Sequence, residues 1–303
     1  MIATPSPALT SSPPTTIGAC ASLACIWEVT APKPGNVYRG ADFDDLSYVD
    51  FLTSAVVIGP VLQQAAELGV GTSVLEALRR TRAAVATNTN LGMLLLLAPL
   101  AAVSADVPLT AGIGSVLAAL TKDDARNVFE AIRLAQPGGL GTVSEADVND
   151  TPAPEISLLE AMQLAAGRDL VACQYSNEFE QVFVVAKNIE QAAERDWPLS
   201  EAIVSAFLRL LADFPDSLIA RKCGQEVARQ VSTQAAAVLS QGEPGAAAYE
   251  DALQEFDFSL RVDGHRRNPG TSADLIAAAL FVLLREERLN WPVKFYGSRE
   301  NDA

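Results

Sequence analysis

The chain is organised around residues 27–45, which read WEVTAPKPGNVYRGADFDD. Two prolines and two glycines fall in this stretch, among seven or more charged and polar side chains. Because proline fixes φ and glycine tolerates positive φ, we predict a rigid loop here rather than a helix. Apolar, helix-forming sequence lies on both sides of it. Binding and catalytic groups often sit on such loops between buried helices, so this is the first place to look for a site.

Helical periodicity extends outward from this loop in both directions. Ile17, Cys20, Ala24 and Trp27 recur at helical spacing on its N-terminal side. Hydrophobic residues make up 49% of the 303 residues and aromatic residues only 6%, which favours Ala- and Leu-rich helix over strand. One run, residues 182–186, resembles a strand, and helix remains open for it as well.

We therefore predict an all-α fold: one orthogonal, bundle-like domain of about ten to twelve helices, counted from the periodic segments. The expected organisation is a disordered tail over 1–14, the helical domain over 15–290 and a C-terminal tail over 291–303. Capping patterns and hydrophobic periodicity predict further details: helix starts at Ser73, Thr121, Ser157 and Asp169, one bent helix over 46–68, one amphipathic helix over 216–239, and a cap at Thr271 or Ser272 for the last helix.

Composition excludes several classes of partner. A formal net charge of −15 argues against nucleic acid and anionic membranes, which both need clustered Lys and Arg. The four cysteines form no C-x-x-C pair, so a zinc site or a disulfide framework is not expected. The N-terminus has no signal-peptide pattern, and the apolar run at 91–103 is too short to span a membrane. We expect a cytoplasmic protein that binds phosphorylated small molecules.

Polar residues gather at four points that precede or begin predicted helices: residues 27–45, 88–92, 216–222 and 268–274. Carboxylates that could serve as catalytic groups or Mg²⁺ ligands are Glu28, Asp42, Asp44, Asp216 and Asp274. Cations that could bind phosphate are Lys33, Arg39, Arg221 and Lys222. Simpler interpretations stand beside these: Asn88 or Asn90 as a helix cap, Asp274 as a carboxylate favoured by a helix dipole, and His265 as an exposed loop residue.

Hydrolase, Walker A and dinucleotide-binding patterns are absent from the sequence, and the glycine-rich run at 138–141 follows a helix rather than a strand. Four other segments carry a resemblance. Residues 28–37 (EVTAPKPGNV) resemble the E-V-x-x-x-P-K-P-G-x-V signature of the triphosphoribosyl-dephospho-CoA synthase family, one residue shorter. Residues 88–92, 216–224 and 268–274 are similar to that family's N-T-H-K-G, D-x-x-x-x-R-K-x-G and N-P-G-x-x-A-D segments. The matches span residues 28–284, nearly the whole chain.

The resemblance implies an all-helical catalytic domain and an enzyme that uses ATP as a ribosyl donor. The 2′-hydroxyl of 3′-dephospho-CoA would displace adenine and give 2′-(5″-triphosphoribosyl)-3′-dephospho-CoA, with Mg²⁺ on the triphosphate. Carboxylates carry proton transfer and charge stabilisation in glycosyl chemistry generally. We accordingly expect catalytic roles for Glu28, Asp42 and Asp44, and metal binding by Glu28, Asp44, Asp216 and Asp274. The expected nucleotide-binding residues are Lys33, Gly35, Asn36, Asn88, Asn90, Arg221, Lys222, Asn268 and Ser272.

Three positions depart from the resembled motifs. Asp42 and Asn90 stand where the family has histidine, and Leu91 stands where it has lysine. These variant motifs are similar to a subgroup associated with tetrahydromethanopterin-dependent one-carbon metabolism. Two alternatives therefore stay open: a related ribosyl- or phosphotransferase acting on a pterin-cofactor precursor, and a non-catalytic nucleotide-binding protein. The sequence also leaves a homo-oligomer open.

Overall fold

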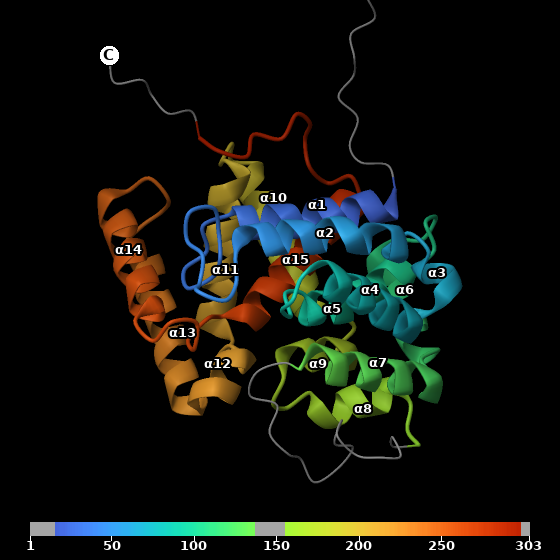
Figure 1. Ribbon diagram of the computed structural model, residues 1–303. Helices are drawn as coiled ribbons and strands as arrows, with labels where there is room; N and C mark the ends of the chain where they lie inside the picture. The colour runs from blue at the N-terminus through green and yellow to red at the C-terminus, as the bar shows by residue number, and fades with distance from the viewer. Residues whose placement is uncertain (1–15, 137–154, 298–303) are drawn as a thin grey trace, which may run out of the picture.

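The structure, a computed structural model, describes residues 16–136 and 155–297 and is built from helices throughout these ranges (Figure 1). No strand occurs in the described part; the loop after the first helix contains only two isolated bridges, Tyr38 with Ala41 and Phe43 with Leu46. The predicted all-α class is confirmed. The predicted tail over 1–14 and the glycine-rich run at 138–141 lie outside the described residues.

The described ranges contain fifteen helices, more than predicted. In chain order they are α1 (Ile17–Thr30), α2 (Tyr48–Leu62), α3 (Ala65–Leu68), α4 (Val70–Ala84), α5 (Leu91–Ala102), α6 (Leu109–Ala118), α7 (Lys122–Ala135), α8 (Leu158–Ala165), α9 (Leu170–Ser176), α10 (Glu180–Ala193), α11 (Leu199–Asp213), α12 (Ser217–Cys223), α13 (Gln225–Ser240), α14 (Ala247–Arg261) and α15 (Gly270–Arg285).

Two unpredicted breaks and one strand-like run that is helical raise the count. The segment predicted as one helix over 216–239 is divided at Gly224, whose φ of +94° no helix accommodates and which glycine adopts at little cost. The segment over 46–68 is likewise two helices, α2 and α3, rather than one bent helix. The strand-like run at 182–186 is part of α10.

Most of the predicted helix starts are confirmed, and two are wrong. Thr121 and Ser157 form capping boxes, and Asp169 caps α9. Ser73 instead lies inside α4, which begins at Val70; its hydroxyl donates to the Gly69 carbonyl. The last helix begins at Gly270, so Thr271 and Ser272 lie within its first turn rather than capping it.

Two apolar helices, α5 and α15, form the centre of the bundle. Every α5 side chain from 93 to 101 is buried, as are all those of α15 from 275 to 284, and helices that are apolar all round belong in a core. Helix α1 packs between α2 and α15, while α7, α8 and α9 lie together on the other side of α5 (Figure 1).

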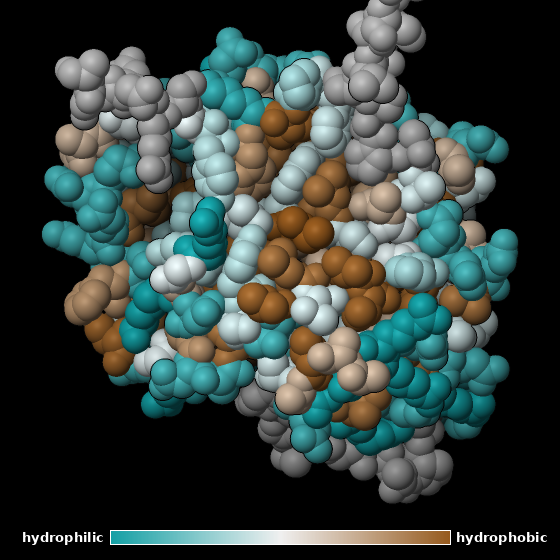
Figure 2. All heavy atoms as spheres, turned by 45° about the horizontal axis from the view of Figure 1, so that its top comes forward, coloured by the Kyte–Doolittle hydropathy of each residue, from teal (hydrophilic) through white to brown (hydrophobic). Residues whose placement is uncertain are grey.

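The face that carries α1 and α2 leaves a band of apolar side chains at the surface (Figure 2). Val49 and Val56 of α2 are among the exposed apolar residues of the chain. Beside this face, residues 291–297 pack back on α1: the Trp291 and Phe295 rings lie 6.0 and 6.3 Å from the Trp27 ring. Within the described ranges no helix is both long and apolar enough to cross a bilayer.

Candidate active site

A cavity of about 760 Å³ opens where the polar points predicted from the sequence meet. Its polar wall comes from the loop after α1, the turn before α5, the C-terminal half of α12 and the start of α15. Its apolar wall comes from α5, α7, α8 and α9, with side chains such as Leu95, Phe129 and Met162. A cleft that joins apolar walls to a few convergent polar groups is the usual form of a small-molecule site.

Asp274 is a carboxyl group in the lining of this cavity. It is the fifth residue of α15 and, among the described residues, has no hydrogen-bond or ion-pair partner. Burial, together with the negative charges of Glu28 and Asp216, raises the pKa of Asp274 well above its usual range. Gly92 of α5 packs directly on this side chain, since a Cβ added at Gly92 would lie 1.9 Å from the Asp274 Oδ2 atom. Position 92 must therefore be glycine if the Asp274 carboxyl is to occupy this place.

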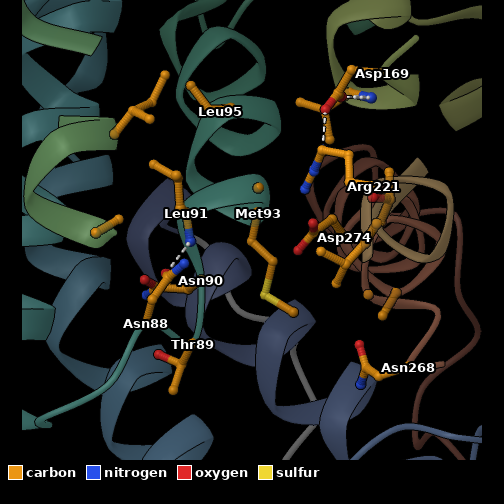
Figure 3. Close-up of a pocket in the computed structure, with 18 of the residues that line it drawn as sticks. Asn88, Thr89, Asn90, Leu91, Met93, Leu95, Asp169, Arg221, Asn268 and Asp274 are labelled. Carbon is orange, nitrogen blue, oxygen red and sulfur yellow. Dashed lines mark hydrogen bonds and ion pairs between the residues drawn. The ribbon is translucent and has the colours of Figure 1, made fainter. Parts of the chain in front are cut away.

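Arg221 stands beside Asp274 on the same wall (Figure 3). Its guanidinium forms an ion pair with Asp169, and Asp169 also accepts hydrogen bonds from Val171 N at 2.9 Å and Ala172 N at 3.2 Å. The pair ties the end of α12 to the start of α9 and fixes the position of the guanidinium at the cavity. Lys222 lines the cavity as well, and burial lowers its pKa.

The turn before α5 forms the opposite wall (Figure 3). The Asn88 Oδ1 atom accepts a hydrogen bond from Leu91 N, the first residue of α5, at 3.2 Å, while Asn90 occupies the cap position without a side-chain cap bond. The Asn90 Nδ2 atom donates to Thr81 Oγ1 at 3.0 Å, while its Oδ1 atom is buried and has no hydrogen-bond partner in the part of the chain that the structure describes. A buried amide oxygen without a donor is costly, so it is a point where a ligand N–H or O–H group fits.

The loop at 27–45 is held together from within by a buried ion pair. The Lys33 ammonium is fully buried, lies 2.8 Å from the Glu28 carboxylate and donates to the carbonyls of Glu28 and Ala31. These three acceptors use the three donors of a lysine. Burial raises the pKa of Glu28, and Lys33 opposes that rise. In this structure Lys33 therefore binds the loop itself, and Glu28 reaches the cavity wall.

Asp216 has a comparable internal role. It is fully buried, caps α12 through Leu218 N and Ile219 N, and accepts two further bonds from the backbone and hydroxyl of Ser272 at 2.7 and 2.9 Å. The neighbouring Ser217 hydroxyl donates to Thr271 Oγ1 and accepts from Leu170 N. The starts of α9, α12 and α15 are thus joined at one buried junction behind the cavity.

The predicted site residues divide into two groups. Those that line the cavity are Glu28, Asn36, Asn88, Asn90, Arg221, Lys222, Asn268 and Asp274. Those that lie outside its lining are Lys33, Gly35, Asp42, Asp44, Asp216 and Ser272. Asp42 accepts a hydrogen bond from Tyr48 N at 2.6 Å, beside the Ser47 cap of α2. Asp44 is exposed, and Gly35 N donates to Asp257. Within the described ranges no group of three or more His, Cys, Asp or Glu residues is arranged to hold a metal ion.

Sequence reasoning missed three residues that shape the cavity and undervalued a fourth. Asp45 and Asp169 line it, Gly92 makes room for Asp274, and His265 reaches it from the loop before α15. The sequence predicts Asp169 only as a helix cap. Asp45 and His265 contact each other in the structure, but they belong to loops far apart in the sequence, and no sequence pattern pairs them.

Fold and cavity together define a helical enzyme whose site gathers loops from both ends of the chain around a cation and a carboxyl group. The comparisons place it more closely. The family model for ATP:dephospho-CoA triphosphoribosyl transferase (CitG) matches residues 14–293, and the chain belongs to this family of transferases. A crystal structure from Archaeoglobus fulgidus, provisionally described as a triphosphoribosyl-dephospho-CoA synthase, is 27% identical with a TM-score of 0.61. The match covers 78% of this chain and 98% of that one. No curated protein sequence matches.

Proposed function

We propose that this chain transfers the triphosphoribosyl group of ATP to a hydroxyl of 3′-dephospho-CoA and releases adenine. A C–O bond forms at C1 of the ATP ribose, and the C1–N9 bond breaks with its electron pair going to the adenine. The acceptor hydroxyl gives up a proton and the departing adenine takes one up, so that the reaction is balanced. Family membership supports the reaction class, and the unpartnered Asp274 carboxyl beside Arg221 is the observation that supports the site.

Asp274 suits the reacting carbon because of what surrounds it. Burial and the nearby carboxylates Glu28 and Asp216 raise the pKa of Asp274, so its charged form is disfavoured. A ribosyl group that develops positive charge as adenine leaves would relieve that penalty. The interaction is therefore stronger in the transition state than in the ground state, which is the condition for catalysis rather than mere binding.

Arg221 and Lys222 are the cations that line the same wall and would bind the triphosphate. The described residues do not build a metal site of their own. Mg²⁺ then belongs to the substrate, arriving on the phosphate oxygens, where this ion commonly needs only one or two protein carboxylates. The predicted set of Glu28, Asp44, Asp216 and Asp274 does not fit a resident metal, because Asp216 is fully bonded and Asp44 lies outside the cavity.

Adenine release tests the proposal directly. The protein is incubated with Mg·ATP and 3′-dephospho-CoA; free adenine is measured by chromatography and the coupled product by mass. We expect Asp274→Ala to lower the turnover rate by about 10²-fold or more, as loss of an electrostatic group does elsewhere. Asp106→Asn, an exposed carboxylate remote from the cavity lining, is the matched control. Full activity of the Asp274 variant would remove that residue from the mechanism.

A second candidate acceptor is a phosphorylated pterin-cofactor precursor. Asn90 and Leu91 both line the cavity, at positions where the resembled motif has histidine and lysine, so this wall offers an amide and an apolar surface instead of two basic groups. Running the adenine assay with each acceptor separately distinguishes the two. Adenine release with the pterin precursor alone would establish the second candidate; release with dephospho-CoA alone would establish the first.

A further inference from the structure

The only histidine of the chain, His265, meets a carboxylate at the cavity. Its Nδ1 atom lies 3.1 Å from Asp45 Oδ1, and both residues line the cavity. They come from loops 220 positions apart, Asp45 from the loop before α2 and His265 from the loop before α15. Both side chains are partly exposed, His265 by 39%, so the pair stands at the solvent side of the cavity rather than in the core.

Several contacts hold the imidazole in place. The Phe43 and His265 rings meet edge to face, with centroids 5.5 Å apart, and the Arg261 guanidinium lies over the Phe43 ring, 5.3 Å from its centroid. The His265 backbone carbonyl accepts from Lys222 Nζ at 3.4 Å and from Asn268 N at 3.3 Å. A surface ion pair is usually loose, but here the backbone and the ring are each fixed by separate partners.

The position of Asp45 favours one tautomer. A carboxylate oxygen 3.1 Å from Nδ1 favours a proton on that nitrogen, which leaves Nε2 as the base in the neutral ring. Among the described residues Nε2 has no hydrogen-bond partner. Asp45, Lys222 and Arg261 are charged groups near the ring and its loop, which itself carries Asp263, Arg266 and Arg267. The arrangement of base and orienting carboxylate is the one by which enzymes activate a hydroxyl.

We propose that His265, oriented by Asp45, is the general base that accepts the proton of the attacking hydroxyl. The inference rests on the proposed function and deepens it. As the hydroxyl oxygen bonds to C1 of the ribose, its proton passes to Nε2; the C1–N9 electron pair leaves with adenine, which is protonated in turn, and the imidazolium returns its proton to solvent. The position at the open side of the cavity suits a large acceptor that cannot be enclosed.

Tautomer state tests the geometry without any assay of activity. With one histidine, ¹⁵N-labelled protein gives a single pair of ring-nitrogen signals. We expect the neutral ring to carry its proton on Nδ1, and Asp45→Asn to shift it toward the Nε2–H form. A wild-type ring protonated on Nε2 would overturn the proposal, whether or not any transfer reaction has been found.

Kinetics test the role. We expect His265→Ala to lower the turnover rate about 10²- to 10⁴-fold, to keep the thermal shift induced by Mg·ATP, and to regain activity with added imidazole. Arg267→Ala is the control, since this neighbour pairs with Asp263 and lies outside the cavity lining. A variant with activity within about threefold of wild type, or one that loses ATP binding and is not rescued, would refute the role. A wild-type protein that releases no adenine with any acceptor would instead refute the proposed function.

Discussion

Replacing Gly92 by alanine tests the contact that positions the Asp274 carboxyl. A Cβ at Gly92 would lie 1.9 Å from Asp274 Oδ2 and 2.5 Å from its Cγ, so the carboxyl has to move. Overpacking of this kind costs about 1–3 kcal/mol. Against this, alanine is better than glycine within a helix by up to about 1 kcal/mol. We expect a net loss of about 1 kcal/mol in the free energy of unfolding, together with a lower turnover rate.

A double-mutant cycle, measured by urea unfolding, isolates the contact. In an Asp274→Ala background the obstacle is gone, and Gly92→Ala should then stabilise the protein. The coupling energy should be at least about 1 kcal/mol, within the range for residues in contact. Gly167→Ala is the control, because nothing lies within 4 Å of a Cβ there. If Gly92→Ala changed stability equally in both backgrounds, the packing of Gly92 on Asp274 would be refuted.

Two further predictions concern buried charge. Lys33→Met should lower the free energy of unfolding by about 3–5 kcal/mol, because it leaves the Glu28 carboxylate buried and unpaired. Adding Glu28→Gln should restore part of this stability. A double variant as unstable as the sum of the two single changes would contradict the pairing. Asp274→Asn should gain stability relative to wild type as the pH rises from about 4, the pKa of an unfolded aspartate. Because its pKa is raised, Asp274 stays protonated to a higher pH in the folded state than in the unfolded state. The free energy of unfolding of the wild type therefore falls as the pH rises, whereas the Asp274→Asn variant has no such contribution at this position. Parallel stability curves for the two proteins between pH 4 and 7 would refute it.

The fold class could be predicted from periodicity, because apolar residues at helical spacing report burial directly. The exact positions at which helices break could not be predicted from this periodicity. Gly224 sits in a stretch that remains amphipathic on both sides, and only its positive φ shows that two helices meet there. The capping-box pattern predicted the helix start correctly at Thr121 and Ser157. Ser73 has the same spacing to Glu76, yet its hydroxyl bonds back to Gly69 from within a helix.

The candidate site was half predictable for a similar reason. Motifs indicate which segments meet, but not which side chains in them face the ligand. Lys33 and Asp216 stand in prominent motifs and are consumed by internal bonds, whereas Asp274 and Arg221 face the cavity. Charge alone cannot separate these outcomes. The Asp45–His265 contact was out of reach because it depends on how two distant loops are placed by the helices between them.

The buried junction around Asp216 has a consequence for how proteins of this kind are recognised. Asp216 is a specified position of the segment at 216–224, yet its carboxylate bonds to Ser272 behind the cavity, where Ser217 also bonds to Thr271. A sequence signature that contains Asp216 therefore detects the packing of three helix starts, and would persist in a protein whose chemistry had been replaced. Substrate preference has to be sought at other positions of the resembled segments, where Asn90, Leu91 and Asp274 line the cavity. The segments thus carry two separable kinds of information, one about architecture and one about reaction.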